Sequence, residues 1–208
     1  RGINSIPSSD ANYTDNYKHI RRTNLLLQNA EAYAKPEDIK QYIGEAYFFR
    51  AYSYFDLLQL YGDVIITKKP LDITDPEMKV KRNDRSEVVD LIIDDLNHAV
   101  ENLPAFKELT TEEEGRISKE GAQAFLSRVA LYEGTWQKSR NGNQNTQRSA
   151  NLLDIAAKAA RTVIDAKYGY TFRLFGTDSE TKILGDSAQK YMFILENEKS
   201  NPAGIKKS

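Results

Sequence analysis

One aromatic stretch most constrains how this chain can fold. Residues 44–64, GEAYFFRAYSYFDLLQLYGDV, place six rings, from Tyr47 to Phe55, around a single arginine, Arg50. At helical spacing Phe48, Ala51 and Phe55 share one face, and tyrosines seven residues apart share a second face. A helix that is apolar nearly all round must be covered on more than one side. We therefore predict that these rings form the interior of a helical stack and are not a ligand site.

The same periodicity predicts four further helices. We expect the aromatic helix to begin at Pro36 and to end at Gly62, because proline suits a first turn and glycine suits a helix end. The other helices are expected at about 14–34, 86–104, 118–136 and 151–167, with Thr14 and Ser118 as caps. A polar loop, residues 139–148, separates the last two.

Two of the predicted helices resemble each other in sequence. Ala46 to Arg50 and Tyr54 align with Ala124 to Arg128 and Tyr132 at a constant offset of 78 residues. Helix pairs of this size with an Ala-x3-Phe step are typical of tetratricopeptide repeats, which bury their apolar faces by stacking. We expect an all-α fold of tetratricopeptide-like helix pairs with long loops, a single unit over residues 1–208, and a short strand near 191–196. The expected structural core includes Phe48, Arg50, Ala51, Phe55, Arg128 and Tyr132.

Arg50 and Arg128 are equivalent in this alignment. Each is expected to pair with a carboxylate and to stack on a ring while its stem packs between helices. The alternative is that both arginines dock a partner.

Composition and charge exclude several classes of protein. Hydrophobic residues make up 40% and charged residues 28%, as in ordinary globular domains. The net charge of −1 offers no overall field for nucleic acid or an anionic membrane surface. The absence of cysteine excludes disulfides, thiolate metal sites and cysteine nucleophiles. No apolar run reaches the length of about 18 residues that a membrane-spanning helix needs.

The sequence lacks the residue patterns of a catalytic or metal site. His19 and His98 lie on different predicted helices, whereas a metal needs three or four convergent ligands. Asp94 and Asp95 are adjacent on one helix and point apart, while a glycosidase needs two carboxyls facing each other across a cleft. No nucleophile elbow or phosphate-binding loop occurs. We expect no enzyme activity, no metal and no cofactor, with a glycosidase as the least favoured function.

The ordered motifs resemble the SusD/RagB family. They are YKHIRRTNLLL, GEAYFFRAYSYFDLLQLYGDV, SEVVDLIIDDLNHAVENLP, GRISKEGAQAFLSRVALYEGTW and AAKAARTVIDAKYGYTF, and the resemblance covers about residues 13–196. It departs from the family at Ile65 and Ile66, where a proline usually follows GDV. Family members run to about twice this length or more. We therefore expect a trimmed chain without the C-terminal lobe of the family.

The resemblance implies a function. Members of the family are surface lipoproteins of Bacteroidetes that capture glycans and sit on a SusC-like TonB-dependent porin, with the tetratricopeptide helices docking on the porin. It implies an outer-membrane location through a lipid anchor outside this chain, and an oligosaccharide or polysaccharide ligand. The alternative is a cytoplasmic tetratricopeptide adaptor that binds a peptide in its concave groove.

Candidate ligand residues are aromatic or planar polar side chains outside the predicted core. Sugars present an apolar C–H face and polar hydroxyls, so they are bound by rings together with amides or carboxylates. Asn12, Tyr13 and Asn16 are expected to precede the first helix, where the resemblance places part of the glycan site. Trp136 borders the polar loop. Its alternative role is packing at the end of its helix.

Overall fold

The computed structural model describes residues 8–72, 74–113, 115–140 and 146–172. Within these residues five α-helices run in series: α1 (Ala11–Glu31), α2 (Lys40–Tyr61), α3 (Arg85–Asn102), α4 (Lys119–Arg140) and α5 (Thr146–Ile164). Short 3-10 turns lie at Pro36–Ile39, Pro76–Lys79, Phe106–Glu108 and Thr111–Glu113. The predicted all-α fold is confirmed, with one isolated β-bridge between Val64 and Asn83 in the part of the chain described. The predicted strand near 191–196 lies outside the described residues.

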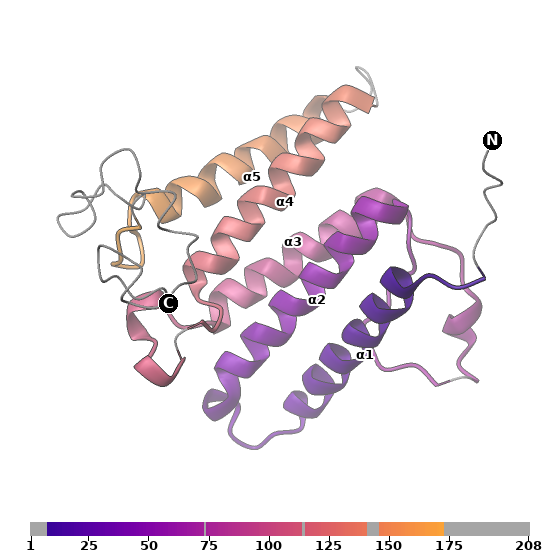
Figure 1. Cartoon of the computed structure of the whole chain (residues 1–208), viewed down its shortest axis with the longest axis horizontal. Helices are drawn as coiled ribbons and strands as arrows, with labels where there is room; N and C mark the ends of the chain where they lie inside the picture. The colour runs from indigo at the N-terminus through magenta and orange to yellow at the C-terminus, as the bar shows by residue number, and fades with distance from the viewer. Residues whose placement is uncertain (1–7, 73, 114, 141–145, 173–208) are drawn as a thin grey trace, which may run out of the picture.

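The helices lie side by side in chain order (Figure 1). α2 packs between α1 and α3, and α4 packs against α3 on one side and α5 on the other. α2 with α3 and α4 with α5 are the most extensively packed pairs. None of the helices in the described ranges combines the length and apolar character that crossing a bilayer demands.

Helix boundaries differ from the prediction at the N-terminal end. α1 begins at Ala11 because the side chain of Asp10 caps it, accepting a hydrogen bond from the Asn12 N–H at 2.9 Å. Thr14 lies inside the helix and donates to the Asp10 carbonyl oxygen instead. The predicted cap at Thr14 is therefore wrong, and the residues expected to precede the helix belong to its first two turns. Pro36 opens a 3-10 turn, so α2 itself begins at Lys40.

The aromatic helix supplies much of the core. Phe48, Ala51, Tyr54 and Phe55 are buried together with Leu58, and the rings of Phe48 and Phe55 meet Phe125 of α4. Small residues allow close helix packing: a methyl group on Gly44 would meet Leu103 of the turn after α3 at 2.9 Å. One side of α2 is only partly covered by the described residues: Phe49 is 48% and Tyr52 is 46% exposed, although the Tyr52 ring stacks on Phe125 of α4 at 5.4 Å.

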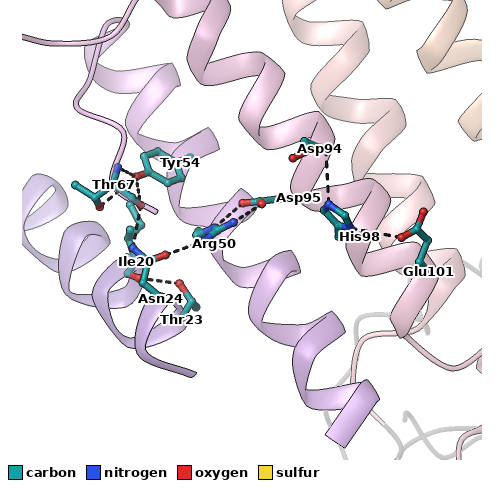
Figure 2. A network of polar contacts seen from close by, with 10 residues as sticks. All are labelled: Ile20, Thr23, Asn24, Arg50, Tyr54, Thr67, Asp94, Asp95, His98 and Glu101. Carbon is teal, nitrogen blue, oxygen red and sulfur yellow. Dashed lines mark hydrogen bonds and ion pairs between the residues drawn. The ribbon is translucent and has the colours of Figure 1, made fainter. Parts of the chain in front are cut away.

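Arg50 is the hub of a buried polar network that joins three helices (Figure 2). Its guanidinium donates to both carboxylate oxygens of Asp95 on α3, at 2.8 and 2.6 Å, and to the Asn24 side-chain oxygen on α1, at 2.8 Å. Burial raises the pKa of Asp95, and the bidentate bond from Arg50 opposes that rise. Each partner therefore depends on the other for its hydrogen bonds.

Arg128 does not share this environment. It is exposed on α4, whereas Arg50 is 5% exposed on α2. The prediction that Arg128 belongs to the core is therefore wrong. Two neighbours, α1 and α3, cover α2 and supply Asn24 and Asp95, and no described element brings an equivalent carboxylate to Arg128. Tyr132 is half-buried, and its ring meets Phe55 edge to face at 5.4 Å.

The connection after α2 is held against the helices by side chains. The Asn24 amide donates to the carbonyl oxygens of Thr67 and Lys69, and the Tyr17 hydroxyl donates to that of Ile65. The Tyr54 hydroxyl accepts the Thr67 N–H at 2.8 Å. Polar groups on α1 and α2 therefore fix the path of the chain through Ile65 and Ile66.

Candidate functional site

The end of α2, the start of α3 and the last turns of α4 lie at one end of the helical array (Figure 1). Residues from these three segments line an open cavity. We call it the end cavity. Its volume is about 490 Å³. It is lined by Tyr61, Gly62, Asp63, Arg82, Asp84, Arg85, Ser86, Trp136 and Gln137.

Trp136 contributes an aromatic wall from α4. The Arg85 guanidinium lies over its ring, 4.1 Å from the ring centre, and donates through Nε to Glu133 at 2.8 Å. Arg85 also bonds through its backbone N–H to Asp63 at 3.0 Å. Trp136 is half-buried, so it both packs at the end of its helix and presents part of its indole to the cavity. Its role in binding stays a prediction.

A cluster of three tyrosines stands beside the same cavity. The Tyr13 ring lies 4.8 Å from Tyr17 and 5.2 Å from Tyr61, and Tyr61 lines the cavity. The Tyr61 hydroxyl donates to the Asp10 carboxylate, which raises the pKa of Tyr61 to about 12 and lowers that of Asp10. Tyr61 therefore stays protonated at neutral pH and holds the start of α1 against the end of α2.

The structure brings some of the predicted ligand residues together. The Tyr13 ring contacts Tyr61, which lines the end cavity together with Trp136. Tyr13 and Trp136 therefore lie at the same end of the array although they are far apart in the sequence. Asn12 and Asn16 follow one another along α1, and the Asn16 amide donates to the Asn12 carbonyl oxygen at 2.9 Å. Neither lines the end cavity. Their role in binding also stays a prediction.

Several residues of the cavity wall are not among the ligand residues predicted from the sequence. From the sequence, the short basic cluster Lys79, Lys81, Arg82 and Arg85 is expected to be a solvated loop. Arg85 is instead the first residue of α3, and its side chain is only 12% exposed. Asp84 caps α3 and forms a capping box with Glu87, a spacing visible in the sequence. The position of this cap beside Trp136 follows only from the packing of α3 against α4.

The described residues contain no group of three or more His, Asp or Glu side chains arranged to hold a metal. The His98 ring stacks on the Tyr47 ring, with 4.9 Å between the ring centres. The Nδ1 atom of His98 lies 3.4 Å from a carboxylate oxygen of Glu101. Asp94 is on the surface near His98, while Asp95 is buried against Arg50, so the two adjacent carboxylates do point apart (Figure 2).

Comparisons with known proteins give one family. A family model described as SusD-like, starch-binding and associating with the outer membrane matches residues 4–131. SusD-like protein P38 of Formosa agariphila is 33% identical over 133 residues, which are 62% of this chain and 25% of that protein. A laminarin-binding SusD-like protein of known structure superposes with a TM-score of 0.64 at 28% identity, over 82% of this chain and 34% of that one.

A SusD-like protein from Bacteroides fragilis superposes with a TM-score of 0.63 at 28% identity, over 79% of this chain and 28% of that one. The chain thus spans about a quarter of the curated relative and about a third of these solved structures. The description of the matched family names binding and not catalysis. Because the family model covers more than half of the sequence, this chain belongs to the SusD-like family described as starch-binding and associating with the outer membrane.

Proposed function

We propose that this protein binds glycans at the end cavity. The observation that carries the proposal is the composition of the cavity wall. Aromatic side chains, Tyr61 and Trp136, stand beside carboxylate, amide and guanidinium groups. Such a wall suits a sugar, whose C–H face packs on a ring while its hydroxyls bond to planar polar side chains.

Glucose polymers are the first ligand class to test. Starch is named in the description of the family, and laminarin in the name of one similar protein of known structure. Both are glucans. The proposal for this chain is therefore a glucan seated on Trp136 and Tyr61, with the Tyr13 ring extending the aromatic surface.

Affinity gel electrophoresis in starch and in laminarin tests the proposal. Replacement of Trp136 or Tyr13 by alanine should weaken retention by up to about tenfold each, because a ring contact contributes roughly 0.5–1.5 kcal/mol. Tyr33→Ala is the matched control, since Tyr33 is an exposed tyrosine remote from the cavity lining. Circular dichroism establishes that each variant is folded.

The possible outcomes distinguish a wrong binding site from a wrong function. If the unmodified protein is retained and both folded variants are retained equally, the site assignment is wrong. If the unmodified protein is not retained in either gel, glucan binding itself is contradicted.

We further propose that the full-length protein is lipid-anchored on the outer surface of the outer membrane and passes oligosaccharides to a SusC-like TonB-dependent porin. The family description supports the membrane association. In this proposal residues 1–208 are one helical unit of a longer protein, without its C-terminal lobe. Sequencing the complete gene tests it: a lipoprotein signal ending in cysteine and a neighbouring porin gene are expected, and their absence would count against both.

A protein-interaction adaptor is the second candidate. The partly covered side of α2 favours it, because Phe49 and Tyr52 present half-exposed rings that a partner could cover. An adaptor of this kind would show no polysaccharide retention, so the same gels distinguish the two functions.

A further inference from the structure

A second open cavity lies between α3 and α5. We call it the α3/α5 groove. Its volume is about 550 Å³, and it is lined by Asp90, Ile93, Asp94, Asn97, Gln147, Arg148, Asn151, Leu152 and Ile155. Apolar side chains make up part of this lining, and Leu152 is buried. The remaining lining consists of amides, carboxylates and one guanidinium, the groups that bond to hydroxyls.

Arg148 stands between the groove and the end cavity. Its Nη2 donates to the Ser86 carbonyl oxygen at 3.0 Å and to the Asp90 carboxylate at 2.8 Å. Ser86 lines the end cavity, whereas Asp90 and Arg148 line the groove. The two cavities therefore adjoin across the first turn of α3.

Spare hydrogen-bonding capacity gathers at this junction. Three buried side-chain nitrogen or oxygen atoms have no hydrogen-bond partner among the described residues, and two of them are Arg85 Nη2 and Arg148 Nε. Arg85 belongs to the end cavity and Arg148 to the groove. The two guanidinium groups thus stand on either side of the junction between the cavities.

The groove continues well beyond this junction. Ser86 and Asn97 lie on the same helix, and at 1.5 Å rise per residue the separation along α3 is roughly 16 Å. Asn97 on α3 and Asn151 on α5 are both exposed at the groove. Gln147 and Asn151 bond to each other at 2.8 Å, which places two amides together on the α5 wall. Asn97 therefore lies well along the groove from the end cavity.

We infer that the two cavities form one binding path for a glucan chain of several sugar units. This inference rests on the proposed function and adds the length of its ligand. Rings in the end cavity hold the first units. The chain then passes Arg148 into the groove, where hydroxyls bond to Asn97 and Asn151. The groove contains no aromatic residue in its lining, so it contributes hydrogen bonds and not ring stacking.

Isothermal titration calorimetry with oligosaccharides of two lengths tests the path. The probes are the disaccharide and the hexasaccharide of both starch and laminarin. The hexasaccharide of the preferred series should bind more tightly than its disaccharide. In the double variant Asn97→Ala/Asn151→Ala this gain in affinity should shrink by about thirtyfold, because two net hydrogen bonds of roughly 1 kcal/mol each are removed.

Gln28→Ala is the matched control, since Gln28 is an exposed amide on α1 outside both cavities. This variant should show the same gain in affinity from disaccharide to hexasaccharide as the unmodified protein. Equal affinities for the two lengths in the unmodified protein would overturn the inference while leaving glucan binding intact. An undiminished gain in the double variant would do the same. Failure of every probe to bind would instead contradict the proposed function.

Discussion

At the scale of single residues, the contrast between Arg50 and Arg128 shows what environment adds to residue type. Both follow Ala-x3 in similar helical segments. The Arg50 guanidinium bonds to the Asp95 carboxylate of α3 and to the Asn24 amide oxygen of α1, so both partners come from neighbouring helices. Removing its side chain would leave the Asp95 carboxylate buried without its counter-charge, which is the costly way to disrupt a buried pair.

Arg50→Ala should lower the free energy of unfolding by about 3–5 kcal/mol for that reason. Arg128→Ala, the matched control at the equivalent position, should change it by no more than roughly 0.5 kcal/mol, as exposed substitutions usually do. Urea unfolding followed by circular dichroism measures both. Similar effects for the two variants would refute the assignment of Arg50 as the structural arginine.

At the scale of elements, close helix packing decides which glycines matter. Gly44 on α2 faces the turn after α3, and a Cβ there would meet both the side chain and the backbone nitrogen of Leu103 at 2.9 Å. Backbone cannot move aside as a side chain can. Gly121 on α4 is also helical, but it is exposed and its nearest neighbour would be 3.8 Å from an added Cβ.

Gly44→Ala should therefore destabilise the protein by roughly 1–3 kcal/mol through overpacking, despite the better helix propensity of alanine. Gly121→Ala should stabilise it by up to about 1 kcal/mol, because only the propensity changes. Thermal unfolding compares the two. An increase in stability for Gly44→Ala would mean that α2 and the turn after α3 are not in close contact.

At the scale of the whole molecule, Arg85 joins two halves of the array. The α2–α3 pair carries the Arg50 network, and the α4–α5 pair carries the single tryptophan, Trp136. Arg85 at the start of α3 bonds to the buried Glu133 of α4 and lies over one face of the Trp136 ring. This connection makes one cooperative unit the expected behaviour, in line with the proposal of a single helical unit.

Tryptophan fluorescence and far-ultraviolet circular dichroism should therefore report the same unfolding midpoint. In Arg50→Ala both midpoints should fall together, although Arg50 and Trp136 lie on different helix pairs. A fluorescence midpoint that stays in place while the dichroism midpoint falls would show that the α4–α5 pair unfolds independently.

The sequence by itself determined the local features. The periodic apolar residues predicted five helices, and the ring-rich segment predicted that one of them is covered on two sides. Both patterns are visible in the sequence because they extend over only a few turns of a helix. The family resemblance also followed from ordered local motifs. The sequence determined the start of α1 less well. Thr14 was the predicted cap, whereas the side chain of Asp10 caps the helix.

Only the tertiary structure decided which residues from distant segments meet. The end cavity needs the end of α2, the cap of α3 and the last turns of α4 in one place, and no spacing along the chain encodes that meeting. The same holds for Arg50 and Arg128, whose flanking sequences are alike. Burial depends on what covers a helix face, and the covering elements lie elsewhere in the chain.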